Sequence, residues 1–384
     1  MQSVQTALNS GSSTVASEIR TRGNGAAHRR ELMVDGEPVS ALSVVPRSVR
    51  ICGVQVRMGG IGGVHTREEQ RKKGYARRLI SETVSYMTRK GYAISMLFGI
   101  PDFYHKFGYL PVIPEHTTTI STREAERAGE AAGSFRSRPV QEDDYPFVAR
   151  LHNRNEHNRP ACMLRKEGEF SEFRQGTDWE RDVSAFMIED EAGERLAYAA
   201  SDKSETAVKV TEVQAVDGSL FGSLLHEFAS MAVERRCGEI ELHLPCDHPF
   251  VRYVRRCGCR SRVHYYRMAG GMMRILNQSP FLASLEPALA QKLRDAGAAS
   301  SPARLQVETD LGRNILQLNA SAPGQARKCR LKAPQNKLMQ LLTGYRTPAD
   351  LARDDDVEID ETGIKVLTVL QPHQAAYVYH ADRF

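Results

Sequence analysis

One stretch of the chain, residues 59–84, restricts the possible fold more than any other part of the sequence. It reads GGIGGVHTREEQRKKGYARRLISETV, with four glycines in a strand-like run and a fifth among arginines and lysines. A helix is expected next, because apolar residues recur on one face at helical spacing, namely Tyr75, Leu79, Ile80, Val84 and Met87. The apolar run YAISMLF follows at residues 92–98. We therefore expect a strand–helix–strand crossover in a partly parallel sheet, preceded by a hairpin at 30–51.

The same order of elements returns later in the chain in weaker form. Strand-like runs at 195–202 and 207–216 precede an amphipathic helix at 219–238 and a strand at 239–245. The next segment, PFVRYVRRCGCR, resembles PDFYHKFGY of the first block, since both have an aromatic start, a helical turn and a glycine. We interpret this similarity as an internal repeat.

A third block has a different, α+β pattern. We expect a long strand-like piece at 303–321, a helix at 336–345, and terminal strands at 364–370 and 375–384. The segment 123–144 is rich in alanine, glycine and charge and is expected to be a linker.

The sequence thus predicts a mixed α/β (α+β) chain in four parts. The first thirty residues are Ser/Thr-rich with several arginines, which suits an atypical or poorly ordered arm better than a transit peptide. The expected parts are an arm at 1–30, an α/β domain at 31–135, a second domain of the same plan at 136–268 and an α+β domain at 269–384.

Composition argues against several classes of protein. The formal net charge of +5 over 384 residues is too small and too dispersed to indicate nucleic-acid binding. No apolar run approaches the roughly 18 residues needed to span a bilayer. Seven cysteines, an odd number, fit a reduced, cytoplasmic setting. We expect neither nucleic acid nor a membrane as a partner.

The glycine among the cations predicts an anion site. Main-chain N–H groups and the helix dipole attract phosphate at a helix start. The spacing fits neither the P-loop, which needs Ser or Thr after Gly-Lys, nor the dinucleotide fingerprint, whose sixth position here is His65. Gly74 and Ala76 are small where a backbone would approach a pyrophosphate, and Lys72, Lys73 and Arg77 add positive charge. The simpler interpretation is a basic helix start on the surface.

The run Arg71-Lys72-Lys73-Gly74-Tyr75-Ala76 resembles the acetyl-CoA signature of the GNAT (Gcn5-related) N-acetyltransferases, Arg/Gln-x-x-Gly-x-Gly/Ala. The resemblance implies acetyl-CoA as co-substrate and no metal. It also implies that the pantetheine arm pairs with the backbone of the preceding strand. The expected cofactor residues are Val64, His65, Thr66, Arg71, Lys72, Lys73, Gly74, Tyr75, Ala76, Arg77, Gly99 and Ile100.

The segment FYHKFGY resembles the turn that closes the GNAT core. The resemblance implies that Tyr104 lies near the thioester sulfur, where a phenol of pKa about 10 can act as a general acid for the leaving thiolate. The alternative for Tyr104 is a packed aromatic ring with a satisfied hydroxyl. We assign that structural role to Tyr109.

The order of domains resembles the enhanced-intracellular-survival (Eis) family of GNAT enzymes. This resemblance implies tandem GNAT folds, a degenerate second one, and a third domain like sterol carrier protein. It also implies that the terminal carboxylate, here on Phe384, accepts the proton of the amine. An α-carboxylate of pKa about 3.3 to 3.7 is a weak base in water, but beside the acceptor it can bind an ammonium group and take its proton. The family normally has a strand and two helices before the hairpin. Here fewer than thirty residues stand there, so either these elements are abbreviated or the true start lies upstream, and acceptor specificity depends on which holds.

The second block has no cations at the place of the glycine–cation turn, so we expect it to be scaffold. One cluster of histidines and cysteines could form a zinc site or simply pack in the core. Its spacings do not follow the usual patterns of zinc ligands, which favours packing. Its members are His243, Cys246, His248, Cys257, Cys259 and His264. The acidic run at 353–360 lacks the calcium-loop glycine and is read as a solvated loop.

Two functions follow as hypotheses. The first is an acetyl-CoA-dependent N-acetyltransferase acting on a polyamine-like molecule, an aminoglycoside or a lysine, with transfer of a longer acyl group as a variant. The second is a non-catalytic protein that binds a hydrophobic ligand or acyl-CoA through its third domain. The resemblance also implies a homo-oligomer, and a hexamer in particular.

Overall fold

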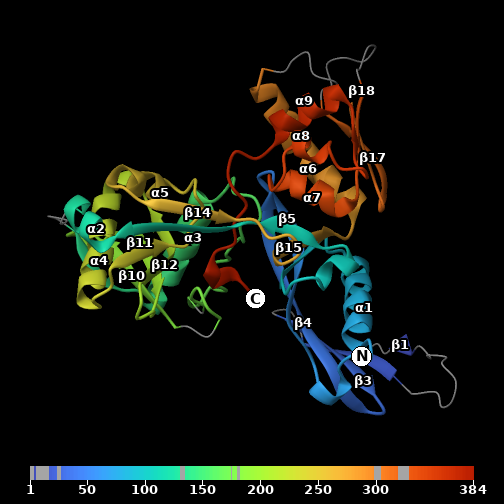
Figure 1. Cartoon of the computed structure of the whole chain (residues 1–384), viewed down its shortest axis with the longest axis horizontal. Helices are drawn as coiled ribbons and strands as arrows, with labels where there is room; N and C mark the ends of the chain where they lie inside the picture. Colours follow the sequence, from blue (N-terminus) through green and yellow to red (C-terminus); the bar gives the residue numbers. More distant parts are fainter. Residues whose placement is uncertain are drawn as a thin grey trace. The chain divides into compact units, whose positions relative to one another are not determined.

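The computed structural model describes residues 4–5, 17–23, 27–129, 135–173, 175–179, 182–297, 304–318 and 328–384 (Figure 1). The chain divides into two compact units. Unit 1 contains residues 1–112, 266–372 and Phe384, and unit 2 contains residues 113–265 and 373–383.

Unit 1 is built on an eight-stranded sheet of order β1-β2-β3-β4-β5-β6-β15-β7. Strands β5 and β6 pair in parallel, and α1 (Tyr75–Arg89) connects them, which is the predicted crossover. The strands are β1 (Val4–Gln5), β2 (Ser17–Arg22), β3 (His28–Val34), β4 (Glu37–Ile51), β5 (Val54–Thr66), β6 (Ile94–Gly99), β15 (Gly270–Ile275) and β7 (Leu110–Ile113).

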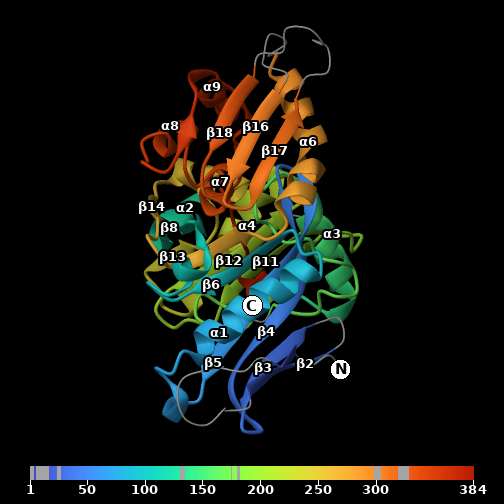
Figure 2. The same cartoon turned by 90° about the vertical axis from the view of Figure 1, so that its right-hand side faces the viewer.

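Helix α1 lies across the sheet of unit 1 (Figure 2). Its buried residues recur at helical spacing and face the strands: Leu79, Ile80, Thr83 and Met87. The helix packs close to the strand at Gly59, where a Cβ atom would come 2.5 Å from the sulfur of Met87. The first of the strand glycines is therefore a packing residue.

The prediction of an atypical or poorly ordered arm at 1–30 is partly wrong. Strand β2 pairs antiparallel with β3, with Ile19 opposite Leu32, and Ile19 joins the apolar core. Two residues of the arm are strand at Val4–Gln5, and the other described positions are strand or turn. Residues 1–3, 6–16 and 24–26 lie outside the described residues.

The carboxyl-terminal part of unit 1 is an α+β layer. A four-stranded sheet of order β17-β16-β18-β19 packs with helices on one side (Figure 2). Its elements are α6 (Gln278–Asp295), β16 (Arg304–Thr309), β17 (Gly312–Gln317), β18 (Lys328–Lys332), α7 (Gln335–Leu342), α8 (Pro348–Leu351), β19 (Glu358–Ile359) and α9 (Glu361–Leu370).

Three expectations for this part need correction. The strand expected at 303–321 is a hairpin, because the chain turns at Asp310 and Leu311. The strand expected at 364–370 is helix α9, whose amino terminus is capped by Asp360. The domain expected at 269–384 also loses its first strand, because β15 belongs to the eight-stranded sheet, between β6 and β7. The helix expected at 336–345 is confirmed as α7.

Unit 2 contains a seven-stranded sheet of order β14-β8-β13-β12-β11-β10-β9. Strands β12 and β13 pair in parallel, and α4 connects them in the sequence. The strands are β8 (Glu115–Ser121), β9 (Arg136–Pro139), β10 (Val183–Glu189), β11 (Arg195–Asp202), β12 (Val208–Ala215), β13 (Glu239–Leu242) and β14 (Arg260–His264). The helices are α2 (Thr122–Ala128), α3 (Tyr145–Asn155), α4 (Phe221–Glu234) and α5 (Pro249–Val254).

The boundary expected at residue 135 is shifted. Strand β8 and helix α2 belong to unit 2, so the segment 123–144 is not a simple linker: it holds α2 and β9. Residues 130–134 lie outside the described residues.

The two units share a plan at the level of elements. In unit 1 the crossover β5-α1-β6 is followed by a short 3₁₀ turn, η2 (Tyr104–Phe107), and β7. In unit 2 the crossover β12-α4-β13 is followed by α5 and β14. In each sheet one strand from elsewhere in the chain, β15 or β8, lies between the last two strands.

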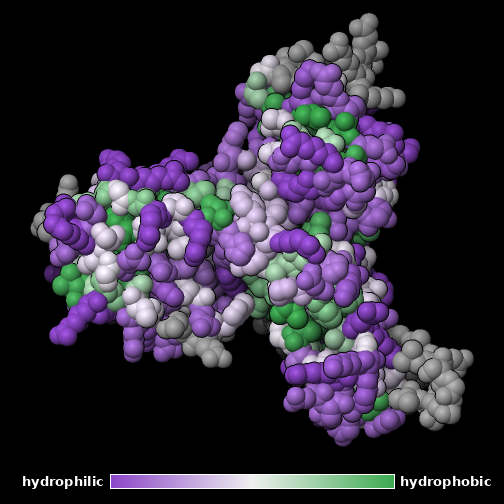
Figure 3. Space-filling model, viewed as in Figure 1, coloured by the Kyte–Doolittle hydropathy of each residue, from purple (hydrophilic) through white to green (hydrophobic). Residues whose placement is uncertain are grey.

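The last residues of the chain do not form the expected strand at 375–384. Among them the structure contains a single turn of 3₁₀ helix, η6 (His380–Asp382), and the preceding residues run without strand pairing. Of the described helices, none has the length and apolarity needed to cross a bilayer. The face drawn in Figure 3 carries mostly hydrophilic residues, with hydrophobic ones in small groups.

Candidate active site

Strands β5 and β6 separate partway along their length. Their parallel pairing runs from Met58 opposite Ile94 to Ile61 opposite Leu97 and ends there. Strand β5 nevertheless continues to Thr66, and within the described residues no strand pairs with it on that side. The edge at Val64 and His65 therefore offers main-chain groups to an extended ligand.

Two positive φ angles shape the turn between β5 and α1. Gly74 has φ 82° and Lys72 has φ 62°. Gly74 is the residue before α1 and supplies no side chain to cap it, and the first helical bond is donated by the amide of Arg78 to the Gly74 carbonyl at 3.0 Å. The amides before Arg78 are thus left for an outside acceptor, which is the geometry of a phosphate site.

A pocket of about 430 Å³ opens at this turn. Its lining includes Thr66, Gln70, Arg71, Lys72, Gly74, Tyr75, Ala76, Arg77 and Phe103. Within the described residues Lys72 and Arg77 have no ion-pair partner, whereas the Lys73 ammonium donates to the Gln70 side chain at 2.9 Å. Exposed cations around free amides suit an anionic group with several oxygens, such as a pyrophosphate.

The structure therefore brings most of the predicted cofactor residues to one place. Val64 and His65 lie on the open edge of β5 rather than in the pocket, and the exposed His65 ring contacts the Gly63 carbonyl at 3.3 Å. Gly99 and Ile100 lie at the end of β6, and the Ile100 side chain is 64% exposed. Sequence reasoning missed Gln70 and Phe103, although both adjoin residues it selected.

Tyr104 is buried beside the end of β6. A Cβ atom at Gly99 would come 2.7 Å from the Tyr104 ring, so glycine is needed there. The ring packs edge-on against Phe103, which lines the pocket, at 5.0 Å between centroids. Burial raises the pKa of Tyr104, and among the described residues no side-chain hydrogen bond contributes to that shift. The phenol is therefore protonated at neutral pH and available to a ligand.

Tyr109 has the structural role assigned to it. Its hydroxyl donates to the Ser95 hydroxyl at 2.8 Å, and Ser95 donates to the Gly59 carbonyl at 2.7 Å. Burial raises the pKa of Tyr109 to about 12. This chain of hydrogen bonds joins β6 to β5 below the point where they separate.

Phe384 lies on the other face of the same two strands. Its ring packs edge-on against Phe98 at 6.1 Å between centroids, and a Cβ atom at Gly60 would come 2.4 Å from that ring. A Cβ atom at Gly62 would come 3.0 Å from the terminal carbonyl carbon of Phe384. Two of the strand glycines thus leave room for the end of the chain.

Side-chain alternation explains how Tyr104 and Phe384 flank the gap. Gly59 and Gly99 face α1 and Tyr104, whereas Gly60 and Gly62 face Phe384. A phenol and a carboxylate therefore approach the separating strands from opposite faces of the sheet. This arrangement can give a proton on one side and accept one on the other.

The corresponding turn in unit 2 has a different character. The carboxylate of Asp217 accepts a hydrogen bond from the amide of Ser219 at 2.8 Å, ahead of α4. An acid here uses an amide that an anion would need and repels negative charge. This geometry supports the prediction that the second block is scaffold.

One histidine of the cluster considered for zinc has a structural role. His248 caps α5, accepting from the amide of Phe250 at 3.2 Å, and the cysteines of the cluster are free thiols. Among the described residues, no three His, Cys, Asp or Glu side chains are arranged to hold a metal ion.

Comparisons with known proteins agree with this geometry. Residues 10–112 match the family of acetyltransferase (GNAT) domains. No curated protein matches the chain. A probable N-acyltransferase from Enterococcus faecalis V583 is 15% identical, with a TM-score of 0.71 over 94% of this chain and 89% of that one. A GCN5-related N-acetyltransferase from Anabaena variabilis is 17% identical, with a TM-score of 0.69 over 93% and 89%.

Eis1 from Mycobacterium abscessus is 14% identical, with a TM-score of 0.64 over 93% of this chain and 90% of that one. At these identities the solved structures show the fold alone. The chain thus carries a GNAT acetyltransferase domain within a mixed α/β, GNAT-like fold that extends over nearly its whole length.

Proposed function

We propose that this chain is an acetyl-CoA-dependent N-acetyltransferase that acetylates a primary amine. The GNAT domain match supports acetyl transfer in general. The observation that supports acetylation of an amine is the position of the Phe384 terminal carboxylate beside Gly62. Gly62 lies on β5, the strand that leads into the pocket suited to a pyrophosphate. No other carboxylate is needed at that face to remove the proton of an amine.

Binding of the co-substrate is assigned to the residues of the turn and the strand edge. The amides from Gly74 to Arg77, with Arg71, Lys72 and Lys73, would hold the pyrophosphate. The edge formed by Val64, His65 and Thr66 would pair with the pantetheine arm, with Gly99 and Ile100 opposite. Bound acetyl-CoA supplies a thioester, whose acyl carbon is open to attack by an amine.

The two flanking groups would move the protons. An alkyl ammonium of pKa near 10.4 must lose a proton before its nitrogen can attack, and the Phe384 carboxylate takes it. The C–N bond forms and the C–S bond breaks, and the Tyr104 phenol protonates the departing thiolate. The nitrogen bonded to the acetyl carbon loses its second proton to solvent. Solvent also restores the Tyr104 proton and removes that of the carboxylate, leaving an amide and a free thiol.

The acceptor is proposed to be a polyamine-like molecule, an aminoglycoside or a lysine. A carboxylate at the acceptor face favours a cationic amine over a neutral nucleophile. We also propose that the layer of β16 to β19 is a sterol carrier protein-like domain and that the chain forms a homo-oligomer. Light scattering in solution measures the oligomeric state.

The interior of the β16 to β19 layer argues against the alternative function, a non-catalytic carrier of a hydrophobic ligand. Its apolar core encloses a cavity of about 20 Å³, lined mainly by leucines from β16, β17, β18, α6, α7 and α9. A cavity needs roughly 10–15 Å³ to hold a single water, so this one has no room for a lipid. Binding of a hydrophobic ligand would require the layer to open.

Thiol release from acetyl-CoA, measured against a panel of amines, tests the proposal. The panel includes a polyamine, an aminoglycoside and a lysine peptide, with acetyl-CoA affinity measured separately by calorimetry. We expect turnover with at least one amine. If acetyl-CoA does not bind and a labelled fatty acid does, the carrier function replaces this proposal.

A further inference from the structure

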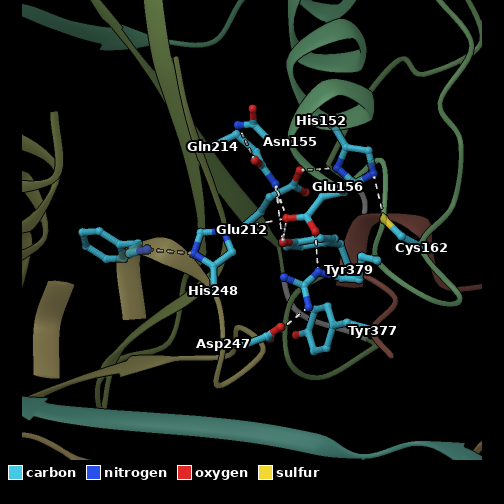
Figure 4. A network of polar contacts seen from close by, with 12 residues as sticks. His152, Asn155, Glu156, Cys162, Glu212, Gln214, Asp247, His248, Tyr377 and Tyr379 are labelled. Atoms are coloured by element: carbon cyan, nitrogen blue, oxygen red, sulfur yellow. Dashed lines mark hydrogen bonds and ion pairs between the residues drawn. The ribbon is translucent and has the colours of Figure 1, made fainter. Parts of the chain in front are cut away.

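The last residues of the chain before Phe384, His373–Arg383, are held in unit 2 by side chains. Figure 4 shows the surrounding network, with His152 and Asn155 on α3, Glu212 and Gln214 on β12, and Tyr377 and Tyr379 on this tail. The tail makes no strand pairing, and one backbone hydrogen bond, from the Tyr377 amide to the Pro160 carbonyl at 3.1 Å, joins it to the rest of unit 2. Its position therefore depends on a few directed contacts.

A bidentate contact two residues before the chain end joins Asp382 to Arg165. The Arg165 guanidinium donates to both Asp382 carboxylate oxygens at 2.9 Å, and to both oxygens of Glu212 at 2.7 and 2.8 Å. Its side chain is only 2% exposed. Such a bidentate pair fixes orientation as well as distance.

The Glu212 carboxylate is fixed from the opposite side. It accepts from the hydroxyl of Tyr198 at 2.6 Å and lies 3.3 Å from the His152 ring. Because Glu212 is already engaged, Arg165 has no free partner to replace Asp382.

Contacts at three other positions, on both sides of Asp382, also hold the tail. The Tyr379 hydroxyl donates to Glu156 at 2.6 Å. Arg159 donates to the Ala375 carbonyl at 2.9 Å and pairs with Asp247 at 3.0 Å, and Asp247 accepts from the Ala375 amide at 3.2 Å. The Arg383 side chain donates to Glu115 at 3.0 Å. The tail is thus held at 375, 377, 379, 382 and 383.

Stability alone does not explain a network of this kind. Apolar side chains of similar volume are often as stabilising as buried ion pairs, since desolvation offsets the Coulombic gain. Chain ends are otherwise among the most poorly ordered parts of a domain. What a set of directed contacts adds is a defined position for the tail.

We propose that the contacts within unit 2 clamp the tail at 373–383, and that Arg165 and Asp382 are positioning residues for the Phe384 carboxylate, which the tail carries through its covalent chain. Asp382 precedes Phe384 by two residues, a span of at most about 7 Å, so losing its bidentate contact leaves the Arg383–Glu115 pair as the remaining ionic contact of the last three residues. The catalytic consequence rests on the proposed function. A misplacement of about 1 Å costs a reaction roughly 100-fold.

Removal of Phe384 by a carboxypeptidase that prefers aromatic ends, followed by mass spectrometry, tests the clamp directly. Such an enzyme stops at Arg383, so one residue is released. The variant Asp382→Asn is compared with Asp144→Asn, a control in the same unit. Asp144 is more deeply buried than Asp382 and pairs with Arg138 at 2.7 Å and Arg195 at 2.6 Å, and these pairs lie outside the tail.

We expect Asp382→Asn to release Phe384 at least about tenfold faster than wild type and to lower kcat, while the KM for acetyl-CoA stays unchanged. Asp144→Asn should leave both rates at the wild-type value. Asp382→Glu, which keeps the charge, should fall between the two. Thermal unfolding midpoints verify that each variant is folded at the assay temperature.

Equal release rates for wild type and Asp382→Asn would overturn the clamp, whatever the activities are. Faster release with an unchanged kcat would support the clamp and refute the catalytic role of the carboxylate. The two failures are therefore distinguishable.

Discussion

The terminal carbonyl carbon of Phe384 lies where a side chain on Gly62 would stand, 3.0 Å from the Cβ position of that glycine. The two residues are distant in sequence, yet the strand glycine and the chain end occupy complementary space. The glycine-rich run in β5 therefore has two purposes: it admits the chain end on one face, and it admits α1 at Gly59 on the other. The central claim of the account, that the terminal carboxylate takes part in acetyl transfer, depends on this contact.

Replacing Gly60 by alanine should displace the chain end without touching the pocket. The new Cβ would come 2.4 Å from the Phe384 ring, so the ring must move. We expect kcat to fall about 10- to 100-fold, since the carboxylate shifts with the ring, and acetyl-CoA affinity to stay within about twofold. Steady-state kinetics and calorimetry measure the two quantities.

Gly238→Ala is the matched control, because a Cβ atom at Gly238 meets nothing within 4 Å. Its kcat should equal that of wild type. A Gly60→Ala enzyme with unchanged kcat would show that Phe384 need not stay where the structure has it.

Replacing Gly74 by alanine should weaken acetyl-CoA binding. Gly74 has φ 82°, a conformation that costs an L-residue about 1–2 kcal/mol. If the turn relaxes to relieve this strain, its amides no longer converge, and we expect acetyl-CoA affinity to fall about tenfold, or 1.4 kcal/mol.

Gly193→Ala carries the same strain at a distance from the pocket, since Gly193 also has φ 82° and open space around its Cβ position. Both variants should lose similar unfolding free energy, and only Gly74→Ala should lose affinity. Equal acetyl-CoA affinities for the two variants would argue against the turn as the phosphate site.

The two buried tyrosines should separate catalysis from stability. Tyr104→Phe removes a hydroxyl whose raised pKa reflects burial, with no side-chain hydrogen bond among the described residues contributing to it, so we expect little change in unfolding free energy but a loss in kcat of about 100-fold. Tyr109→Phe breaks the bond to Ser95, and we expect about 1 kcal/mol less stability with kcat near wild type. Thermal unfolding and thiol-release kinetics check both. If Tyr104→Phe kept its kcat and Tyr109→Phe lost it, Tyr104 would not be the proton donor.

Acid should loosen the network that holds the tail. Burial alone would raise the pKa of Glu156, but Arg159, His248 and the Tyr379 hydroxyl together lower it to about 2. A carboxyl whose folded pKa lies below its unfolded value of about 4.3 contributes its full stability above that value. This contribution is lost as the pH falls from about 4.3 towards 2.

In Glu156→Gln, the fall of the unfolding free energy between pH 5 and 2.5 should be shallower than in wild type, by roughly 2–3 kcal/mol over that range. Chemical denaturation at a series of pH values measures it. Parallel curves for the two proteins would mean that Glu156 is not held ionised by the network.

Local patterns in the sequence were enough to predict the core of unit 1. The apolar spacing of α1 and the short turn at Tyr104–Phe107 are properties of contiguous residues, and both are found. Helix α9 was mistaken for a strand because β-branched residues dominate it. Its buried positions, Gly363, Val366, Leu367 and Leu370, do have helical spacing, and Asp360 caps it.

The parts that sequence could not predict depend on distant segments. Nothing near β8 or β15 shows that each strand completes a sheet whose other strands come from elsewhere in the chain. The alternation of the tail at 375–384 suggested a strand, yet side chains far away in the sequence, such as Arg165 and Glu156, hold it without pairing. The purpose of the glycines at 60 and 62 could not be predicted, because their neighbour Phe384 is remote in sequence.

One measurement tests the central claim most directly: the kcat for acetyl transfer by a chain with a single glycine appended after Phe384. The extension moves the carboxylate by one residue and leaves every side chain in place, including those of the pocket at Gly74. The account predicts that acetyl-CoA affinity stays within about twofold of wild type while kcat falls about 100-fold or more. An extended chain that turns over amines at the wild-type rate would contradict it.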